Sequence, residues 1–253
     1  MQEQPQGAEP PKAVDTDSAL DGLIAVVREA VRPYVSLVGE VAGVHARSLA
    51  LFGAAAAGTF DSARHTISNV LVLDAVDLDL LRRLAEHGAR LGKARVAAPL
   101  IMTPAYVRAS LDSFPLELIE IHQQHVTVLG GEYFAELSFD DHHVRLQCER
   151  EFKRILIGLR QGLLAAAGRE KLVPAMEEEA CGGLLRTLRG MLWLKGHRQA
   201  MPAADVLNRI EQATELKLPG LRASLMPTGA HGWREFDALY ADVAALGEIA
   251  DAW

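Results

Sequence analysis

The spacing of apolar and polar residues changes along the first half of the chain. Apolar positions in residues 18–46 recur at helical spacing, with Ser18 as the expected N-cap and Pro33 as the expected break or kink. Beyond residue 46, short apolar runs typical of strands alternate with helical spacing. The expected elements are strands at 47–53 and 66–73, a helix at 76–92, a strand at 94–103, a short helix at 104–112, and one or two strands at 116–131.

The second half is helical in pattern. After Asp140 and Asp141 one apolar stripe recurs at intervals of three and four residues, which predicts a long helix that ends at Gly168. The stripe consists of Val144, Cys148, Phe152, Ile155, Leu159 and Leu163. Further helical segments follow, with expected breaks at Pro174, Gly182–Gly183 and Pro219.

These patterns divide the chain into three parts. Residues 1–17 are rich in Pro, Gln and acidic side chains, and we expect a disordered tail there. Residues 18–140 predict a small mixed-sheet domain, and residues 141–253 predict an all-α helical bundle. The predicted fold class is therefore α+β.

Composition narrows the function classes. The chain has 253 residues, 49% of them hydrophobic, and a net charge of −7, which argues against a surface devoted to nucleic acid or anionic membrane. Cys148 and Cys181 lack the paired spacing of zinc sites or disulfide frameworks. The first residues do not form a signal peptide, and no apolar run is long enough to span a membrane. We expect a cytoplasmic protein without a nucleic-acid or membrane partner.

A glycine turn between the first two expected strands carries the main functional signal. Gly53-Ala54, the eleven residues 55–65 and Thr66-Ile67-Ser68 resemble, in position and spacing, the Gly-Ser and Asp-x-Asp motifs of the DNA polymerase beta-like nucleotidyltransferase superfamily. The α/β half followed by a helical bundle is similar to the kanamycin nucleotidyltransferase architecture. The resemblance covers residues 20–250 in architecture, but Thr66 and Ser68 stand where the family has its two carboxylates.

That replacement changes the expected chemistry. Two carboxylates, two residues apart on a strand, can bridge Mg²⁺ ions, whereas Thr and Ser are neutral and supply no charge compensation. The resemblance implies a third carboxylate on a later strand, for which Glu117 or Glu120 is the candidate. The turn 53–58 either serves structure alone or retains phosphate contact through its backbone, with Gly53, Ala54 and Gly58 as the binding residues.

Three other patterns have a structural and a functional interpretation. Asp140–His143 combines metal-ligand residue types, but an N-cap on the long helix explains its acids. His122 and His125 would lie close together only on a helix. The long helix is basic, so Arg150, Lys153 or Arg154 could contact phosphate, although Glu149 and Lys153 have the spacing of an ordinary helical ion pair.

The sequence therefore predicts a nucleotidyltransferase-like protein that has lost its two-metal site, an inactive homologue that binds nucleotide weakly or has a regulatory or interaction role. We expect a nucleotide or a protein as its partner, and no metal or cofactor. The alternative is an active transferase that uses Mg²⁺ with non-standard acids such as Asp61, Glu117 or Glu120. In a third interpretation the protein acts only through protein contacts. The chain contains neither a P-loop nor a G-x-S-x-G motif, which argues against P-loop enzymes and α/β-hydrolases.

Overall fold

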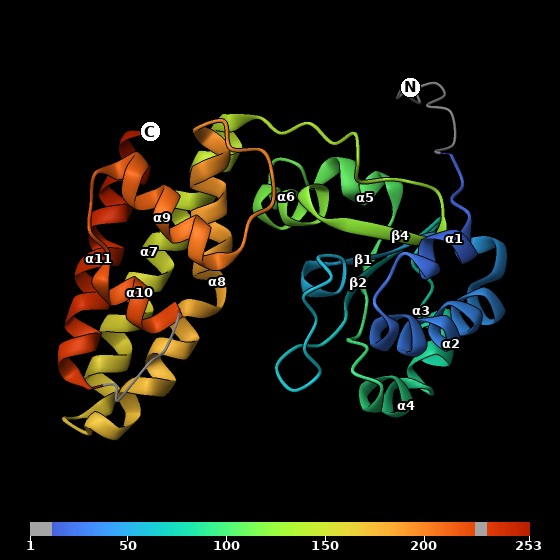
Figure 1. Cartoon of the computed structure of the whole chain (residues 1–253), viewed down its shortest axis with the longest axis horizontal. Coiled ribbons are helices and arrows are strands. Elements are labelled where there is room, and N and C mark those ends of the chain that lie inside the picture. The colour runs from blue at the N-terminus through green and yellow to red at the C-terminus, as the bar shows by residue number, and fades with distance from the viewer. Residues whose placement is uncertain (1–11, 226–231) are drawn as a thin grey trace. The chain divides into compact units, whose positions relative to one another are not determined.

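The computed structural model describes residues 12–225 and 232–253, which divide into two compact units (Figure 1). Unit 1 contains the described residues up to Ala109 together with Glu120–Leu137. Unit 2 contains Ser110–Ile119 and the described residues from Ser138 onward. The segment Ser110–Ile119, which the sequence pattern assigned to the first domain, therefore groups with the helical unit. None of the described helices is long and apolar enough to cross a membrane.

Unit 1 is built from short helices and a small sheet. Its helices are α1 (Thr16–Asp21), α2 (Ala25–Ala42), α3 (Leu78–Ala85), α4 (Gly88–Lys93) and α5 (Pro104–Ala109), with one-turn 3-10 helices at Gly43–His45 and Gly53–Ala55. Its strands are β1 (Ala46–Phe52), β2 (Ser68–Leu73), β3 (Leu100–Met102) and β4 (His125–Gly130). The strand order is β3-β2-β1-β4, antiparallel except for the parallel pair β2 and β3. This mixed sheet confirms the predicted α+β class.

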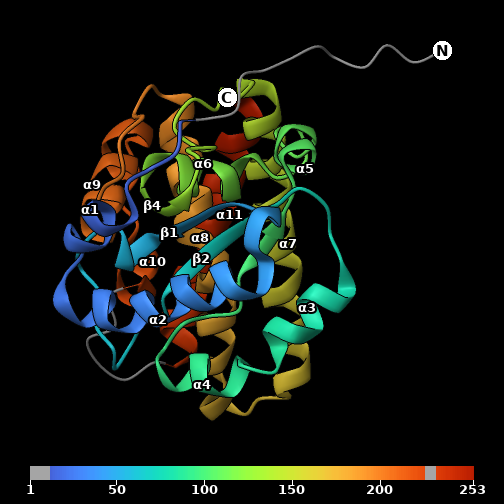
Figure 2. The same ribbon diagram turned by 90° about the vertical axis from the view of Figure 1, so that its right-hand side faces the viewer.

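The core of unit 1 lies between the sheet and helix α2, which runs along β1 and β2 (Figure 2). Alternate strand residues such as Leu51 and Leu71 are fully buried in this core. Tyr34 of α2 is also buried, and its hydroxyl donates a hydrogen bond to Asn69 Oδ1 (2.8 Å). Burial raises the pKa of Tyr34, because its charged form would lose solvation. The tyrosine therefore anchors α2 to the start of β2.

The prediction of a disordered tail is wrong for residues 12–17. The amide of Val14 donates to the carbonyl of Gly130 (2.8 Å), which attaches this segment to the end of β4. Asp15, rather than Ser18, caps α1, because its carboxylate accepts hydrogen bonds from two amides of the first turn. Residues 1–11 of the expected tail lie outside the described residues.

Two helix breaks fall at unexpected places. Helix α2 continues through Pro33, and the break lies at residues 22–24 instead. Pro33 and Glu29 are exposed, so water can reach the carbonyl that the proline leaves without a donor. The expected helix at 76–92 is divided into α3 and α4. The expected strand at 94–103 shortens to β3, preceded by a single bridge between Ile67 and Val96.

Of the one or two strands expected at 116–131, only β4 is present. Residues Pro115–Gln123 form helix α6 instead. Its apolar spacing fits a strand as well as a helix, but Pro115 favours a helix start and Gln147 Oε1 accepts the amide of Leu116 (2.8 Å). Gln147 lies 31 residues further on, so no local pattern reveals this cap. As a consequence Glu117 and Glu120 lie on a helix, and the predicted strand carboxylate is wrong.

Unit 2 is a helical bundle. Besides the first part of α6 it contains α7 (Asp141–Ala166), α8 (Val173–Leu194), α9 (Ala203–Thr214), α10 (Pro219–Leu225) and α11 (Trp233–Ala252), with a 3-10 turn at Glu170–Leu172. Asp140 caps α7 as the structural interpretation predicts, accepting from the amide of His142 (2.8 Å). The predicted stripe on α7 is buried up to Leu159, whereas Leu163 is 43% exposed. Helix α8 continues through Gly182–Gly183 without the expected break.

Candidate functional site

The glycine turn begins directly after β1. Gly53 adopts a φ of 65° and Gly58 a φ of 70°, in the left-handed region that glycine enters without steric cost. The carbonyl of Gly53 accepts hydrogen bonds from the amides of Ala56 and Ala57, and the carbonyl of Ala54 accepts one from Thr59. Two of the backbone amides that the phosphate interpretation invoked, those of Ala56 and Ala57, are therefore bonded within the turn itself.

The loop that follows the turn is held by its own polar side chains. The Asp61 carboxylate accepts a hydrogen bond from the amide of Ala63 (2.9 Å), and the Asp61 amide donates to His65 Nδ1 (3.0 Å). Arg95 Nε donates to the carbonyl of Ser62 (2.7 Å) from outside the loop. Asp61, an acid that the alternative function would recruit, is thus part of a local turn.

The two positions of the altered motif differ in structure. Thr66 precedes β2 and is exposed, whereas Ser68 is the first residue of β2, is half-buried, and lies opposite Phe52 of β1. Ile67 between them is fully buried in the core under α2. None of the strands in the described part of the chain contains Asp or Glu.

A metal site would need converging acidic or nitrogen ligands, and the described residues do not supply them. Within residues 12–225 and 232–253, no group of three or more His, Cys, Asp or Glu side chains is placed to hold a metal ion. The hydroxyls of Thr66 and Ser68 offer neutral oxygens only. The described residues therefore do not fit the two-metal arrangement of the family.

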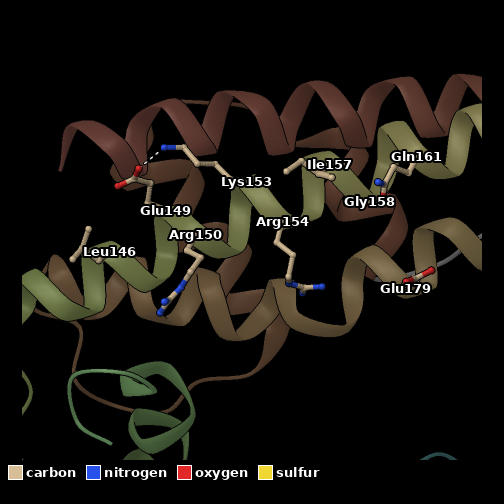
Figure 3. A pocket seen from close by; sticks show the side chains of 9 residues that line it. All are labelled: Leu146, Glu149, Arg150, Lys153, Arg154, Ile157, Gly158, Gln161 and Glu179. Carbon is tan, nitrogen blue, oxygen red and sulfur yellow. Dashed lines mark hydrogen bonds and ion pairs between the residues drawn. The ribbon is translucent and has the colours of Figure 1, made fainter.

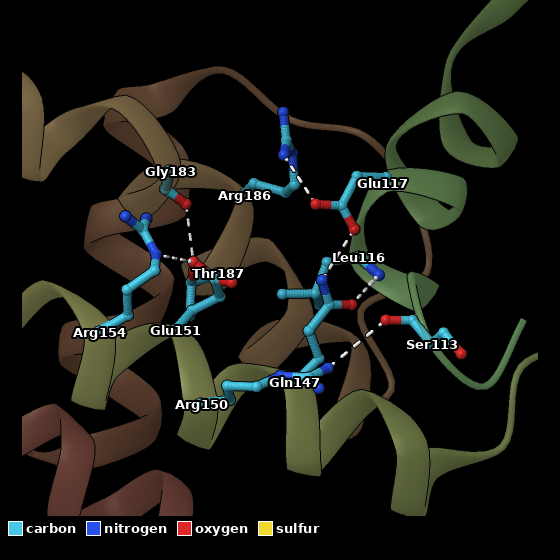
Figure 4. Close-up of polar contacts among 10 residues, drawn as sticks. All are labelled: Ser113, Leu116, Glu117, Gln147, Arg150, Glu151, Arg154, Gly183, Arg186 and Thr187. Carbon is cyan, nitrogen blue, oxygen red and sulfur yellow. Dashed lines mark hydrogen bonds and ion pairs between the residues drawn. The ribbon is translucent and has the colours of Figure 1, made fainter. Parts of the chain in front are cut away.

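Glu117 is bonded inside unit 2 (Figure 4). One carboxylate oxygen accepts from Gln147 Nε2 of α7 (2.8 Å), and the other accepts from a guanidinium nitrogen of Arg186 of α8 (3.0 Å). Both oxygens of this candidate acid thus connect three helices. Glu120 lies half-buried on the same helix but belongs to unit 1.

The predicted phosphate-binding cations lie along a groove of about 700 Å³ on α7 and α8 (Figure 3). Lys153 forms an ion pair with Glu149, which lowers the pKa of Glu149 and raises that of Lys153 through their hydrogen bond. Arg154 Nε pairs with Glu151 (2.9 Å). Arg150 donates to the carbonyl of Ser113 (3.4 Å). Arg150 and Lys153 belong to unit 2, and the turn with Gly53, Ala54 and Gly58 belongs to unit 1.

A half-buried polar cluster, which the sequence pattern did not reveal, lies on β4 and the residues just after it. His125 Nε2 lies 2.8 Å from Glu132 Oε1, and Thr127 donates to the other oxygen of Glu132 (2.8 Å). His125 Nδ1 contacts the carbonyl of Ile121 (2.7 Å), which can only accept, so both ring nitrogens donate and the ring is an imidazolium. His125 and Thr127 are two apart on β4, but Glu132 lies two residues beyond the end of this strand at Gly130, and no spacing rule signals its contact with them.

The pKa values of this cluster follow from its contacts. Burial alone would lower the pKa of His125, but the hydrogen bond to Glu132 and its negative charge outweigh burial and raise it. Burial would likewise raise the pKa of Glu132, whereas the hydrogen bonds from His125 and the amide of Phe134 lower it to about 2. Both shifts therefore favour the charged forms of the pair.

Comparisons with known proteins identify a fold relative only. No family model and no curated protein matches the sequence. Among solved structures, the chain is similar to spectinomycin adenyltransferase AAD(9) from Enterococcus faecialis, whose structure contains ATP and spectinomycin. The TM-score is 0.56 and the sequence identity 8%, and the alignment covers 88% of this chain and 98% of that chain. The predicted nucleotidyltransferase-like fold is thereby confirmed.

Proposed function

We propose that this protein is a nucleotidyltransferase-fold pseudoenzyme that has lost the two-metal site and acts through weak nucleotide binding in a regulatory or interaction role. The observation that carries the proposal is the absence of Asp and Glu from all strands of the described sheet, with Thr66 and Ser68 at the motif positions. Phosphoryl and nucleotidyl transfer depends on positioned metal ions that neutralise the triphosphate, and hydroxyl groups cannot replace carboxylates in that role.

The acids of the alternative function have other partners. Glu117 binds Gln147 and Arg186, and Asp61 holds its own turn. Moving Glu117 to a metal would break its hydrogen bonds with Gln147 and Arg186. These contacts favour the pseudoenzyme over an active transferase with displaced acids.

A nucleotide-transfer assay tests the proposal. We expect no transfer above background from any of the four NTPs with Mg²⁺ or Mn²⁺, measured as pyrophosphate release and as labelled product with a panel of hydroxyl acceptors. Glu117→Ala and Glu120→Ala should leave that background unchanged, with unfolding curves recorded in parallel. Metal-dependent transfer that either substitution abolishes would establish the active alternative instead.

A further inference from the structure

Unit 1 contains a cavity of about 510 Å³ beside helices α3 and α4 and the β2–β3 edge of the sheet. Its wall is mainly apolar, with Leu81 and Leu84 from α3, Leu91 from α4, and Val96 and Ile101 from the sheet edge. The three leucines are only partly buried, so the helices leave apolar surface facing open space. A cavity of this size and character is typical of small-molecule sites.

The polar groups of the cavity are few and have one sign of charge. Arg95 is the charged residue among its described lining residues, and no Asp or Glu joins it there. Thr66 and Tyr34 add hydroxyl groups, of which the Tyr34 hydroxyl is already bonded to Asn69. An apolar cavity with a single guanidinium and no acid is complementary to an apolar ligand that carries one negative charge.

Arg95 is held in place by backbone and side-chain hydrogen bonds at the end of α4. Its φ is 62°, a left-handed conformation that glycine or asparagine would adopt at lower cost. Its carbonyl accepts from the amide of Ile67 (2.7 Å), and its Nε donates to the carbonyl of Ser62 (2.7 Å). That single side-chain bond leaves the two terminal guanidinium nitrogens as donors, because Arg carries five N–H groups. The left-handed φ belongs to the C-cap of α4, where the amide of Val96 donates to the carbonyl of Leu91 and the amide of Arg95 to that of Gly92.

The surrounding helices have the same charge preference. Residues 78–95 contain five basic and two acidic residues, a local charge of +3 in a chain of −7. The bases are Arg82, Arg83, Arg90, Lys93 and Arg95, and the acids are Asp79 and Glu86. This positive segment attracts anions toward the cavity mouth.

We propose that the cavity binds a small amphipathic carboxylate, with its chain or ring against Leu81, Leu91 and Ile101 and its carboxylate on the terminal nitrogens of Arg95. The cavity lining includes Thr66 of the motif positions but none of the turn residues Gly53, Ala54 and Gly58, and its occupation is measured without nucleotide. The two proposals therefore fail or succeed independently.

Calorimetric titration with octanoate tests the charge recognition, with octylammonium and 1-octanol as ligands of the same chain length. We expect octanoate to bind, 1-octanol to bind more weakly and octylammonium not to bind at neutral pH. Arg95→Gln should weaken octanoate binding ~10-fold or more, the scale of a lost charge-assisted contact. Arg90→Gln is the matched control, because Arg90 lies on α4 outside the cavity lining and carries the same charge. It should change the affinity less than about twofold.

A second pair of variants tests the location. Gly92 lines the cavity and has open space at its Cβ position, so Gly92→Leu should fill part of the cavity and reduce octanoate binding. Gly39 of α2 also has open space but lies outside the lining, so Gly39→Leu should preserve binding. Absence of octanoate binding by the parent protein, equal binding of octanoate and octylammonium, or equal effects of Arg95→Gln and Arg90→Gln would each overturn the proposal.

Discussion

Two strands flank the end of β1 in unit 1, and they differ in the side chains they present beside Phe52. Ser68 of β2 and His125 of β4 are both cross-strand partners of Phe52, so they lie on the same face of the sheet. On the β2 side the motif positions hold neutral hydroxyls. On the β4 side Glu132 reaches this face and is bound by His125 and Thr127.

The difference shows where charge is tolerated in this fold. The carboxylate of Glu132 is satisfied by a buried imidazolium, a hydroxyl and a backbone amide, so it stabilises the structure instead of awaiting a metal. At Thr66 and Ser68 no carboxylate remains to be satisfied. This end of the sheet is therefore charged where the charges are internally paired and carries neutral hydroxyls at Thr66 and Ser68.

The largest effect on stability is expected for a substitution of Glu132. Glu132→Ala removes the partner of the His125 imidazolium and the acceptor for Thr127 and Phe134, and should lower the free energy of unfolding by about 2–3 kcal/mol. Glu136→Ala, an exposed acid in the same loop, is the control and should change stability by less than about 0.5 kcal/mol. Urea unfolding measures both. A loss at Glu132 no larger than at Glu136 would show that the pair does not stabilise unit 1.

The pH dependence of stability should report the same pair. The pKa of His125 is raised above its ordinary 6.5, so its contribution is complete below pH 6.5 and is lost as pH rises through the folded value. The pKa of Glu132 is lowered from 4.5 to about 2, so its contribution is present above pH 4.5 and is lost as pH falls toward 2. The pair therefore contributes most to the free energy of unfolding between about pH 4.5 and pH 6.5.

His125→Phe provides the test of that assignment. Urea unfolding at pH 6 and at pH 8.5 should show a smaller fall in stability with rising pH for the variant than for the parent protein. His87, a half-exposed histidine at the start of α4, is a suitable control position, and His87→Phe should keep the parent's pH dependence. Identical pH profiles for all three proteins would contradict the role of His125.

Much of the sheet could be predicted from sequence, for a physical reason. Strands β1 and β2 are mostly buried, so they contain continuous apolar runs at 49–52 and 70–73 within the expected strands 47–53 and 66–73. Helix α6 could not be recognised in the same way, because its start depends on the distant side chain of Gln147. Here a long-range hydrogen bond decides between two structures that local spacing leaves equal.

The candidate site was predictable to a similar extent. Counting from Gly53 places the altered motif at Thr66 and Ser68, and β2 does begin at Ser68. The role of Glu132 was beyond such counting, because this residue follows the end of β4 and contacts Thr127 of the same strand, five residues back. The strand assigned to Glu117 was wrong for the reason that applies to α6 as a whole. Spacing along one element is readable in sequence, whereas contacts across a turn or between helices are not.

Placing acids at positions 66 and 68 should remove the contrast between the β2 side and the β4 side of the sheet. In the double variant Thr66→Asp with Ser68→Asp, two carboxylates would repel a bare triphosphate and bind it only through an ion. We expect the parent to bind ATP weakly without metal and the variant to need Mg²⁺, as measured by calorimetric titration with and without Mg²⁺. Because Thr66 is exposed and Ser68 half-buried, the variant should stay folded. If neither protein binds ATP under any condition, the interaction-protein interpretation replaces ours.

The smallest expected effects concern two cations in the groove on α7 and α8, Arg150 and Lys153. Lys153 already has Glu149 as its partner, so Lys153→Gln removes a charge that is largely neutralised. Arg150 contacts only the carbonyl of Ser113 through its side chain among the described residues, so its full positive charge acts on an approaching nucleotide. We therefore expect Arg150→Gln to weaken metal-free ATP binding by about threefold. The loss of affinity in Lys153→Gln should be less than half as large.

Titrations of ATP at low salt and at 0.15 M salt provide the measurement. The difference between the two variants should shrink at the higher salt, because screening acts on the unpaired charge. Equal effects would mean that Glu149 does not neutralise Lys153 in solution, and the groove would then carry more positive charge than its ion pairs indicate.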